Sequence, residues 1–280
     1  MSYDLHIHTI ASDGADTPQE VVMAAVAHGL QGMAITDHDT MGALAAARDY
    51  IASKRIQIEF IPGIELNTDY GEDEVHILGY YIGYEQQAME ARLTEIRQAR
   101  YDRAEKMVGR LQQLGLDLDI EQVKALAQGE LIGRPHIARA LRQKGWVTTE
   151  EEAFARYIGR GQPAYVPRYK FTPQEAIGLV KEAGGISVLA HPGLIQDKQK
   201  ILEVIRMGIE GLEVYYPEHD RQQTREFEAL AVSHRLLITG GSDYHGADSS
   251  LNRSQIGMCG IDAVMMGILR DYHRSRSGLV

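Results

Sequence analysis

The chain has 280 residues, of which 44% are apolar and 24% are charged, and this composition excludes a disordered or fibrous protein. Its single cysteine, Cys259, excludes an internal disulfide and a cysteine-rich zinc site, so any metal must be held by nitrogen and oxygen atoms. The formal net charge of −10 argues against general adhesion to nucleic acid, although cations bound in an acidic pocket would attract a polyanion there.

The sequence gives no sign of a targeting or membrane segment. No basic stretch followed by an apolar one precedes the first strand-like run, and no apolar run approaches the length that spans a bilayer. The low cysteine content also fits a reducing compartment. We therefore expect a cytoplasmic protein that does not associate with membranes, and no segment indicates an obligate protein partner.

Short apolar segments typical of strands alternate with helical patterns along most of the chain. The segments are 3–9, 32–36, 56–62, 75–80, 186–190, 211–215 and 236–239. Two helices between them have clear start signals, because Thr17-Pro18-Gln19-Glu20 and Thr172-Pro173-Gln174-Glu175 each combine an N-cap threonine, a proline and a glutamate. The alternation predicts a parallel α/β fold.

The alternation of strand-like and helical segments is interrupted between residues 87 and 166. The apolar positions of 87–114 follow the spacing of one long amphipathic helix, and shorter helices are expected near Pro135 and after Thr148. We expect a catalytic domain formed by 1–86 plus 167–280, with 87–166 as a helical insertion that covers its active site.

Side chains that bind metals recur along the chain, and most of them follow the end of a predicted strand. They are His6, His8, Asp13, His38, Glu65, His76, His191, Asp243 and His245. Side chains two residues apart on a strand point the same way, so the first two imidazoles can hold one cation. Each residue alone also fits a purely structural role, but gathering nine such groups at one edge of the sheet without metal would cost much free energy. The sequence therefore predicts a multinuclear metal centre.

These residues form a recognisable set of motifs: His6-x-His8, Asp13, Thr36-Asp37-His38, Gly63-x-Glu65, His76-x-Leu78-Gly79, Ala190-His191-Pro192 and Asp243-x-His245. The set resembles the PHP family, the polymerase and histidinol phosphatase phosphoesterases. Within it, the insertion with Gly133-Arg134-Pro135-His136 and Gly159-Arg160-Gly161 is similar to the nucleoside 3′,5′-bisphosphate phosphatases, which are related to 5′-3′ exoribonucleases. The resemblance implies a distorted (β/α)7 barrel with three divalent metals.

The resemblance also implies a division of the ligands. One metal would bind His6, His8, Glu65 and Asp243, a second Glu65, His76 and His191, and a third Asp13, His38 and His245. A catalytic role is implied for Asp13, His38, Glu65, His191, Asp243 and His245. Imidazole and carboxylate ligands suit manganese, iron or zinc better than magnesium, and we expect Mn²⁺ first, with Fe²⁺ or Zn²⁺ as alternatives.

Three residues of the insertion are candidates for binding the substrate. Arg134 precedes a proline at a predicted helix start, where free N–H groups favour an anion, and His136 follows it. Arg160 lies between two glycines and could contact a phosphate through its guanidinium. The alternative for both arginines is an exposed surface position.

The expected activity is the hydrolysis of the 3′-phosphate of nucleoside 3′,5′-bisphosphates. It would act on a small nucleotide, and trimming of short 5′-phosphorylated RNA or DNA oligonucleotides would be a second activity. Two alternatives remain open, namely a histidinol phosphatase and a noncatalytic metal-binding module. Hydrolysis of a C–N bond at a similar barrel site is less favoured, because no lysine stands in an obvious bridging position.

Overall fold

A computed structural model describes residues 2–71, 73–83, 87–127, 131–246 and 255–276. In these ranges seven strands form one sheet in the order of the chain: β1 (Tyr3–Asp4), β2 (Gly32–Ile35), β3 (Glu59–Tyr70), β4 (Asp73–Tyr80), β5 (Ile186–Leu189), β6 (Gly211–Tyr215) and β7 (Leu237–Gly240). The sheet nearly closes, because the N–H of Leu5 donates to Gly240 at 3.2 Å and that of His8 donates to Tyr244 at 2.8 Å. The prediction of a distorted seven-stranded α/β barrel is confirmed.

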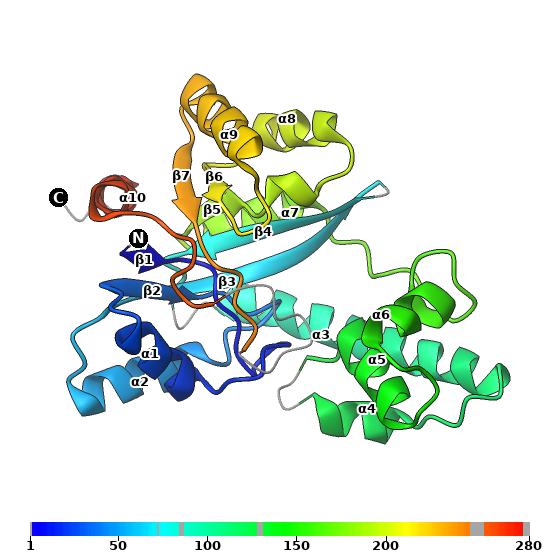
Figure 1. Ribbon diagram of the computed structural model, residues 1–280. Coiled ribbons are helices and arrows are strands. Elements are labelled where there is room, and N and C mark those ends of the chain that lie inside the picture. The colour runs from blue at the N-terminus through cyan, green and yellow to red at the C-terminus, as the bar shows by residue number, and fades with distance from the viewer. Residues whose placement is uncertain (1, 72, 84–86, 128–130, 247–254, 277–280) are drawn as a thin grey trace.

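Helices cover the outside of this barrel (Figure 1): α1 (Pro18–Ala27), α2 (Leu44–Lys54), α7 (Pro173–Glu182), α8 (Lys198–Arg206), α9 (Arg221–His234) and α10 (Ala263–Arg276), with a short 3₁₀ turn at Pro192–Leu194. Thr17 and Thr172 form the expected capping boxes, in which each hydroxyl accepts from the N–H of the glutamate three residues on. No helix in the described ranges is long and apolar enough to cross a membrane.

The expectation of a parallel sheet is wrong for β4, which runs antiparallel to both β3 and β5. Tyr70 pairs with Asp73, so the connection is a tight hairpin, whereas a parallel crossover needs a dozen or more residues. The hairpin also changes where two candidate ligands lie. Glu65 pairs with Leu78, and His76 pairs with Asn67, so both candidates lie within strands and not at strand ends.

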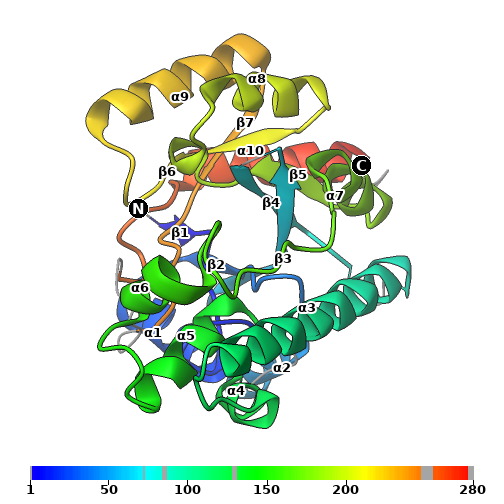
Figure 2. The same cartoon turned by 90° about the vertical axis from the view of Figure 1, so that its right-hand side faces the viewer.

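The segment 87–166 forms a group of helices beside the barrel (Figure 2): α3 (Gln87–Gln113), α4 (Ile120–Leu126), α5 (Arg134–Gln143), α6 (Glu150–Ala153) and a π-helical turn at Phe154–Ile158. The N-cap of α6 is Thr149, one residue later than expected. These helices share a core of their own around residues such as Met107 and Leu141. The separate core supports the proposed insertion, whose exact boundaries stay a prediction.

Helix α3 belongs to both cores. Its first half packs Leu93 and Ile96 against the core of the barrel, and its second half packs Met107 and Leu111 in the core of the insertion. The stretch between them is therefore held from both ends. Any side chain that α3 presents there has a fixed position relative to the barrel mouth.

We expect Gly241→Ala, next to the barrel closure, to lower the free energy of unfolding by about 1–3 kcal/mol. A Cβ at this position would lie 2.3 Å from the Cβ of His6 and 2.4 Å from its backbone nitrogen, so the chain would have to move. Urea denaturation measures the loss. Gly109→Ala on α3 is the control, since an added methyl meets nothing within 4 Å, and equal stability of the two variants would contradict the close packing at Gly241.

Candidate active site

Glu65 is the centre of the barrel mouth, and its buried carboxylate lies among five imidazoles from four segments of the chain. Oε2 is 3.2 Å from Nε2 of both His6 and His8 and 3.0 Å from Nδ1 of His38, while Oε1 is 2.8 Å from Nδ1 of His76 and 3.0 Å from Nε2 of His191. One carboxylate cannot satisfy so many ring nitrogens. Within the described residues, both ring nitrogens of His8, Nδ1 of His38 and Nε2 of His76 are buried without a hydrogen bond.

The other three candidate ligands complete the group. Asp243 places Oδ1 3.0 Å from Nε2 of His8, and Asp13 places Oδ1 3.4 Å from Nε2 of His245. Oδ2 of Asp13 is 3.8 Å from Nε2 of His38. The structure therefore brings all nine residues into one mouth, although they come from segments spread along the whole barrel sequence.

Three sets of these residues have ligand atoms within 4.8 Å of one another: His6, His8, Glu65 and Asp243; His8, Asp13, His38 and His245; and His38, Glu65 and His76. Nitrogen and carboxylate oxygen at these separations, with unsatisfied ring nitrogens, fit divalent cations. The first set is the predicted one, and the second adds His8 to the predicted third set. His191 shares Oε1 of Glu65 with His76.

The electrostatics of the mouth follow from this crowding. Burial alone would lower the pKa of His6, but the carboxylates of Glu213, Glu65 and Asp243 hold it well above its usual value. Burial would raise the pKa of Glu65, but His38, His6 and His76 hold it well below the ordinary range. Without metal these shifts favour a proton on the ring of His6, and a metal bound through that ring must release it.

Residues outside the nine hold the ligands in place. Glu213 on β6 accepts from Nδ1 of His6 at 3.0 Å and from the N–H of His191 at 2.7 Å. The hydroxyl of Tyr216 donates to Oδ2 of Asp243 at 2.8 Å. Sequence reasoning missed Glu213, because β6 is buried along almost its whole length and its pattern does not show which side chains face the mouth.

Two candidate ligands have left-handed backbone conformations, with φ of 26° at His191 and 52° at Asp243. Such conformations cost of order 1–3 kcal/mol each in residues other than glycine, and they persist only where the surroundings impose them. Here the hydrogen bond from the N–H of His191 to Glu213 is one such restraint. The barrel thus fixes the direction of these side chains before any ligand binds.

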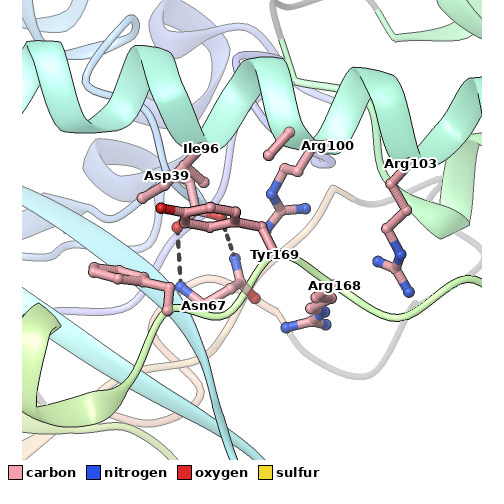
Figure 3. A pocket seen from close by; sticks show the side chains of 9 residues that line it. Asp39, Asn67, Ile96, Arg100, Arg103, Arg168 and Tyr169 are labelled. Carbon is pink, nitrogen blue, oxygen red and sulfur yellow. Dashed lines mark hydrogen bonds and ion pairs between the residues drawn. The ribbon is translucent and has the colours of Figure 1, made fainter.

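A second cavity adjoins the metal-binding mouth and shares Asp13, His38, Glu74 and His76 with it. Its other lining residues include four arginines: Arg100 and Arg103 of α3, Arg134 of α5, and Arg168. Figure 3 shows a neighbouring pocket that shares Arg100, Arg103 and Arg168 with this cavity. The cavity is therefore strongly basic in a chain whose net charge is negative.

Several of these guanidinium groups have donors to spare. Arg103 donates Nε to the carbonyl of Val166 at 2.7 Å, but its buried Nη2 has no hydrogen-bond partner among the described residues. The same holds for Nε and Nη1 of Arg168 in that part of the chain. Burial, with Arg134, Arg168 and Arg100 nearby, lowers the pKa of Arg103 to about 9. An anion would satisfy these donors and relieve this repulsion.

The predicted substrate-binding residues lie in different places. Arg134 and His136 line the basic cavity, whereas Arg160 is exposed and does not belong to the residues that line it. Nδ1 of His136 accepts from the N–H of Gly133 at 3.0 Å, so a neutral ring carries its proton on Nε2. Burial lowers the pKa of His136 to about 4, which keeps the ring neutral.

Sequence reasoning missed Arg100, Arg103 and Arg168. A signal for the first two exists, because they take positions in the apolar stripe of α3 between Ile96 and Met107. Charged residues at such positions are buried against the rest of the protein and need a reason to be there. Arg168 has no comparable signal, since it lies in an irregular segment that precedes α7.

A barrel whose mouth gathers imidazoles and carboxylates in this way, beside a basic cavity, defines a metal-dependent hydrolase of anionic substrates. Comparison with known proteins specifies the class further. The PHP domain model matches residues 4–144. A crystal structure described as a metal-dependent phosphoesterase from Bifidobacterium adolescentis superposes with a TM-score of 0.85 at 31% identity, covering 98% of this chain and 96% of that one.

Curated relatives agree with this match. The 5′-3′ exoribonuclease Rnm of Escherichia coli is 35% identical over 87% of this chain and 85% of its own length. The 3′,5′-nucleoside bisphosphate phosphatase of Chromobacterium violaceum is 34% identical over 86% of both. A phosphoribosyl 1,2-cyclic phosphate 1,2-diphosphodiesterase of Eggerthella lenta is 30% identical over 88% of this chain and 95% of its own. The chain belongs to the PHP domain family of metal-dependent phosphoesterases.

We expect Glu213→Gln to weaken metal binding by about 10- to 100-fold, because residues that orient a ligand imidazole commonly have effects of this size. The amide would lose a charge-assisted bond to His6 without removing a candidate ligand. Competition with a chelator for Mn²⁺ or Zn²⁺ gives the affinity. The control is Glu228→Gln, because the carboxylate of Glu228 accepts from the hydroxyl of Tyr215 outside the mouth, and its loss should leave the metal affinity unchanged. Equal affinities in the wild type and both variants would refute the role of Glu213.

Proposed function

We propose that this phosphoesterase removes the 3′-phosphate from nucleoside 3′,5′-bisphosphates and also shortens small 5′-phosphorylated oligonucleotides from that end. The observation that carries the proposal is the pair of adjoining cavities, one lined by candidate metal ligands and one by arginines. A substrate with two phosphates fits this arrangement, since one phosphate would react at the mouth while the other is held by guanidinium groups. The names of the relatives from Chromobacterium violaceum and Escherichia coli support both activities.

We assign three divalent cations to the mouth, with Mn²⁺ as the first choice and Fe²⁺ or Zn²⁺ as alternatives. The proposed ligands are the nine predicted residues, with Glu65 shared between two cations. Divalent cations, when bound, supply an activated water and neutralise charge on the phosphoryl group. The chain itself positions six side chains around the reacting phosphate. These are the proposed catalytic residues: Asp13, His38, Glu65, His191, Asp243 and His245.

The non-reacting phosphate would bind in the basic cavity. Arg103 and Arg134 offer guanidinium donors there, and His136 offers the N–H at Nε2. A 5′-terminal phosphate would occupy this position in a bisphosphate and in an oligonucleotide alike. The two substrates differ only in what the reacting phosphate carries on the side away from the 3′-oxygen, which is the rest of the chain in an oligonucleotide. A role for Arg160 stays a prediction, and its exposed position suits a longer substrate.

Metal removal should abolish phosphate release from adenosine 3′,5′-bisphosphate, and Mn²⁺ should restore it more fully than Mg²⁺, since the ligand set is rich in imidazole. Elemental analysis of the repleted protein is expected to find three transition-metal ions per chain. Retained activity after exhaustive chelation, with no metal in the sample, would contradict the assignment. His234→Gln on α9 is a control histidine outside the mouth and should keep the full metal content.

Arg103→Ala should raise KM for adenosine 3′,5′-bisphosphate by about 10- to 100-fold, because a hydrogen bond to a charged group typically contributes about 1.5–3 kcal/mol. KM for histidinol phosphate or 4-nitrophenyl phosphate, which lack a second phosphate, should hardly change. The control is Arg48→Ala, which removes the same charge from an exposed arginine of α2 that pairs with Asp49. Should wild-type enzyme prefer histidinol phosphate, the histidinol phosphatase alternative would replace this proposal.

A further inference from the structure

Glu74 occupies the boundary between the two cavities. It lies two residues before His76 on β4, so both side chains point to the same face of the hairpin, and Glu74 lines the mouth as well as the basic cavity. A substrate that extends from the metals to the arginines must therefore pass this carboxylate. A negative charge at that point is unexpected in a cavity for anions.

The carboxylate of Glu74 is bound by two of the arginines. Nη2 of Arg134 donates to Oε1 at 2.5 Å, and Nη2 of Arg168 donates to Oε2 at 2.6 Å. Each oxygen thus has its own guanidinium partner. A phosphate also presents separate oxygens to two guanidinium groups, so the carboxylate occupies the place of an anion in the free protein.

We propose that Glu74 is a resident competitor for the non-reacting phosphate of the substrate, and this rests on the proposed function of the basic cavity. In the free enzyme its carboxylate holds Arg134 and Arg168 together and limits their mutual repulsion. When the phosphate binds, Arg134 turns from the carboxylate to the phosphate. Glu74 therefore sets the affinity of the cavity for anions and assists release of the product that carries this phosphate.

Exposure and charge favour such an exchange. The side chain of Glu74 is 38% exposed, whereas those of Arg134 and Arg168 are 16% and 15% exposed. Water can solvate the carboxylate once it is released, while the arginines remain largely buried and need an anionic partner. The cavity contains four arginines against the carboxylates of Asp13 and Glu74, while Asp39 pairs with Arg100 beside it. Displacement of Glu74 therefore leaves a surplus of positive charge for a phosphate dianion.

Glu74→Gln tests the competition directly, because it keeps the size of the side chain and removes its charge. Adenosine 5′-monophosphate is the probe, since it carries the non-reacting phosphate and no 3′-phosphate. We expect its dissociation constant, measured by calorimetry on the metal-loaded protein, to fall at least threefold in Glu74→Gln. KM for adenosine 3′,5′-bisphosphate should fall in parallel, and KM for 4-nitrophenyl phosphate should stay within twofold.

A matched control is Glu95→Gln on α3, whose exposed carboxylate pairs with Arg92 away from both cavities. It changes the net charge equally and should leave all three constants unchanged. Weaker or unchanged binding of the monophosphate to Glu74→Gln would overturn the proposal and make Glu74 a structural anchor of the arginines. Failure of the proposed function can be distinguished from failure of the proposal for Glu74. A wild-type enzyme that does not prefer the bisphosphate would refute the proposed substrate, while the titration with adenosine 5′-monophosphate would still report on Glu74.

Discussion

One carboxylate, that of Glu65, must remain ionised although it is buried at the base of the mouth, and the imidazoles around it make this possible. An isolated buried charge is very costly, so the surrounding cationic groups, either protons on histidines or divalent metals, are a condition of the fold and of the chemistry alike. The hairpin of β3 and β4 places Glu65 within a strand, whose backbone is held by Leu78 on one side and by hydrogen bonds with Asp37 and Asp39 on the other. The left-handed residues His191 and Asp243 then bring their side chains to it.

The reacting centre and the basic cavity come from two cores that share one helix. The barrel core fixes the metal-binding residues, the core of the insertion fixes α5 with Arg134, and α3 is packed into both. Arg100 and Arg103 lie on α3 between these two regions of packing. The distance between the metal-binding mouth and the basic cavity is therefore set by hydrophobic packing on either side, and not by a flexible linker. Such a fixed distance supports the proposed selection of substrates by the spacing of two phosphates.

Overall charge and local charge have opposite signs in this protein. The net charge of −10 would repel a nucleotide at long range, but the Debye length at physiological ionic strength is only about 8 Å. Inside the basic cavity the arginines outnumber the carboxylates, and burial reduces screening there. In the proposed function, a small group of cavity residues thus governs binding of the nucleotide, and the net negative charge acts against sequence-independent adhesion to long polyanions.

The sequence by itself determined the nine metal-binding candidates, the capped helices, the long helix of the insertion, and Arg134 and His136 in the cavity, because these follow from residue chemistry and short-range periodicity. It could not determine that β4 runs antiparallel, that Glu213 orients His6, or that Arg103 and Arg168 face the same cavity. Those facts depend on contacts between distant positions, such as Glu74 and Arg168, which are 94 residues apart. Periodicity tells which face of an element is buried, but only the packed tertiary structure decides which side chains meet across it.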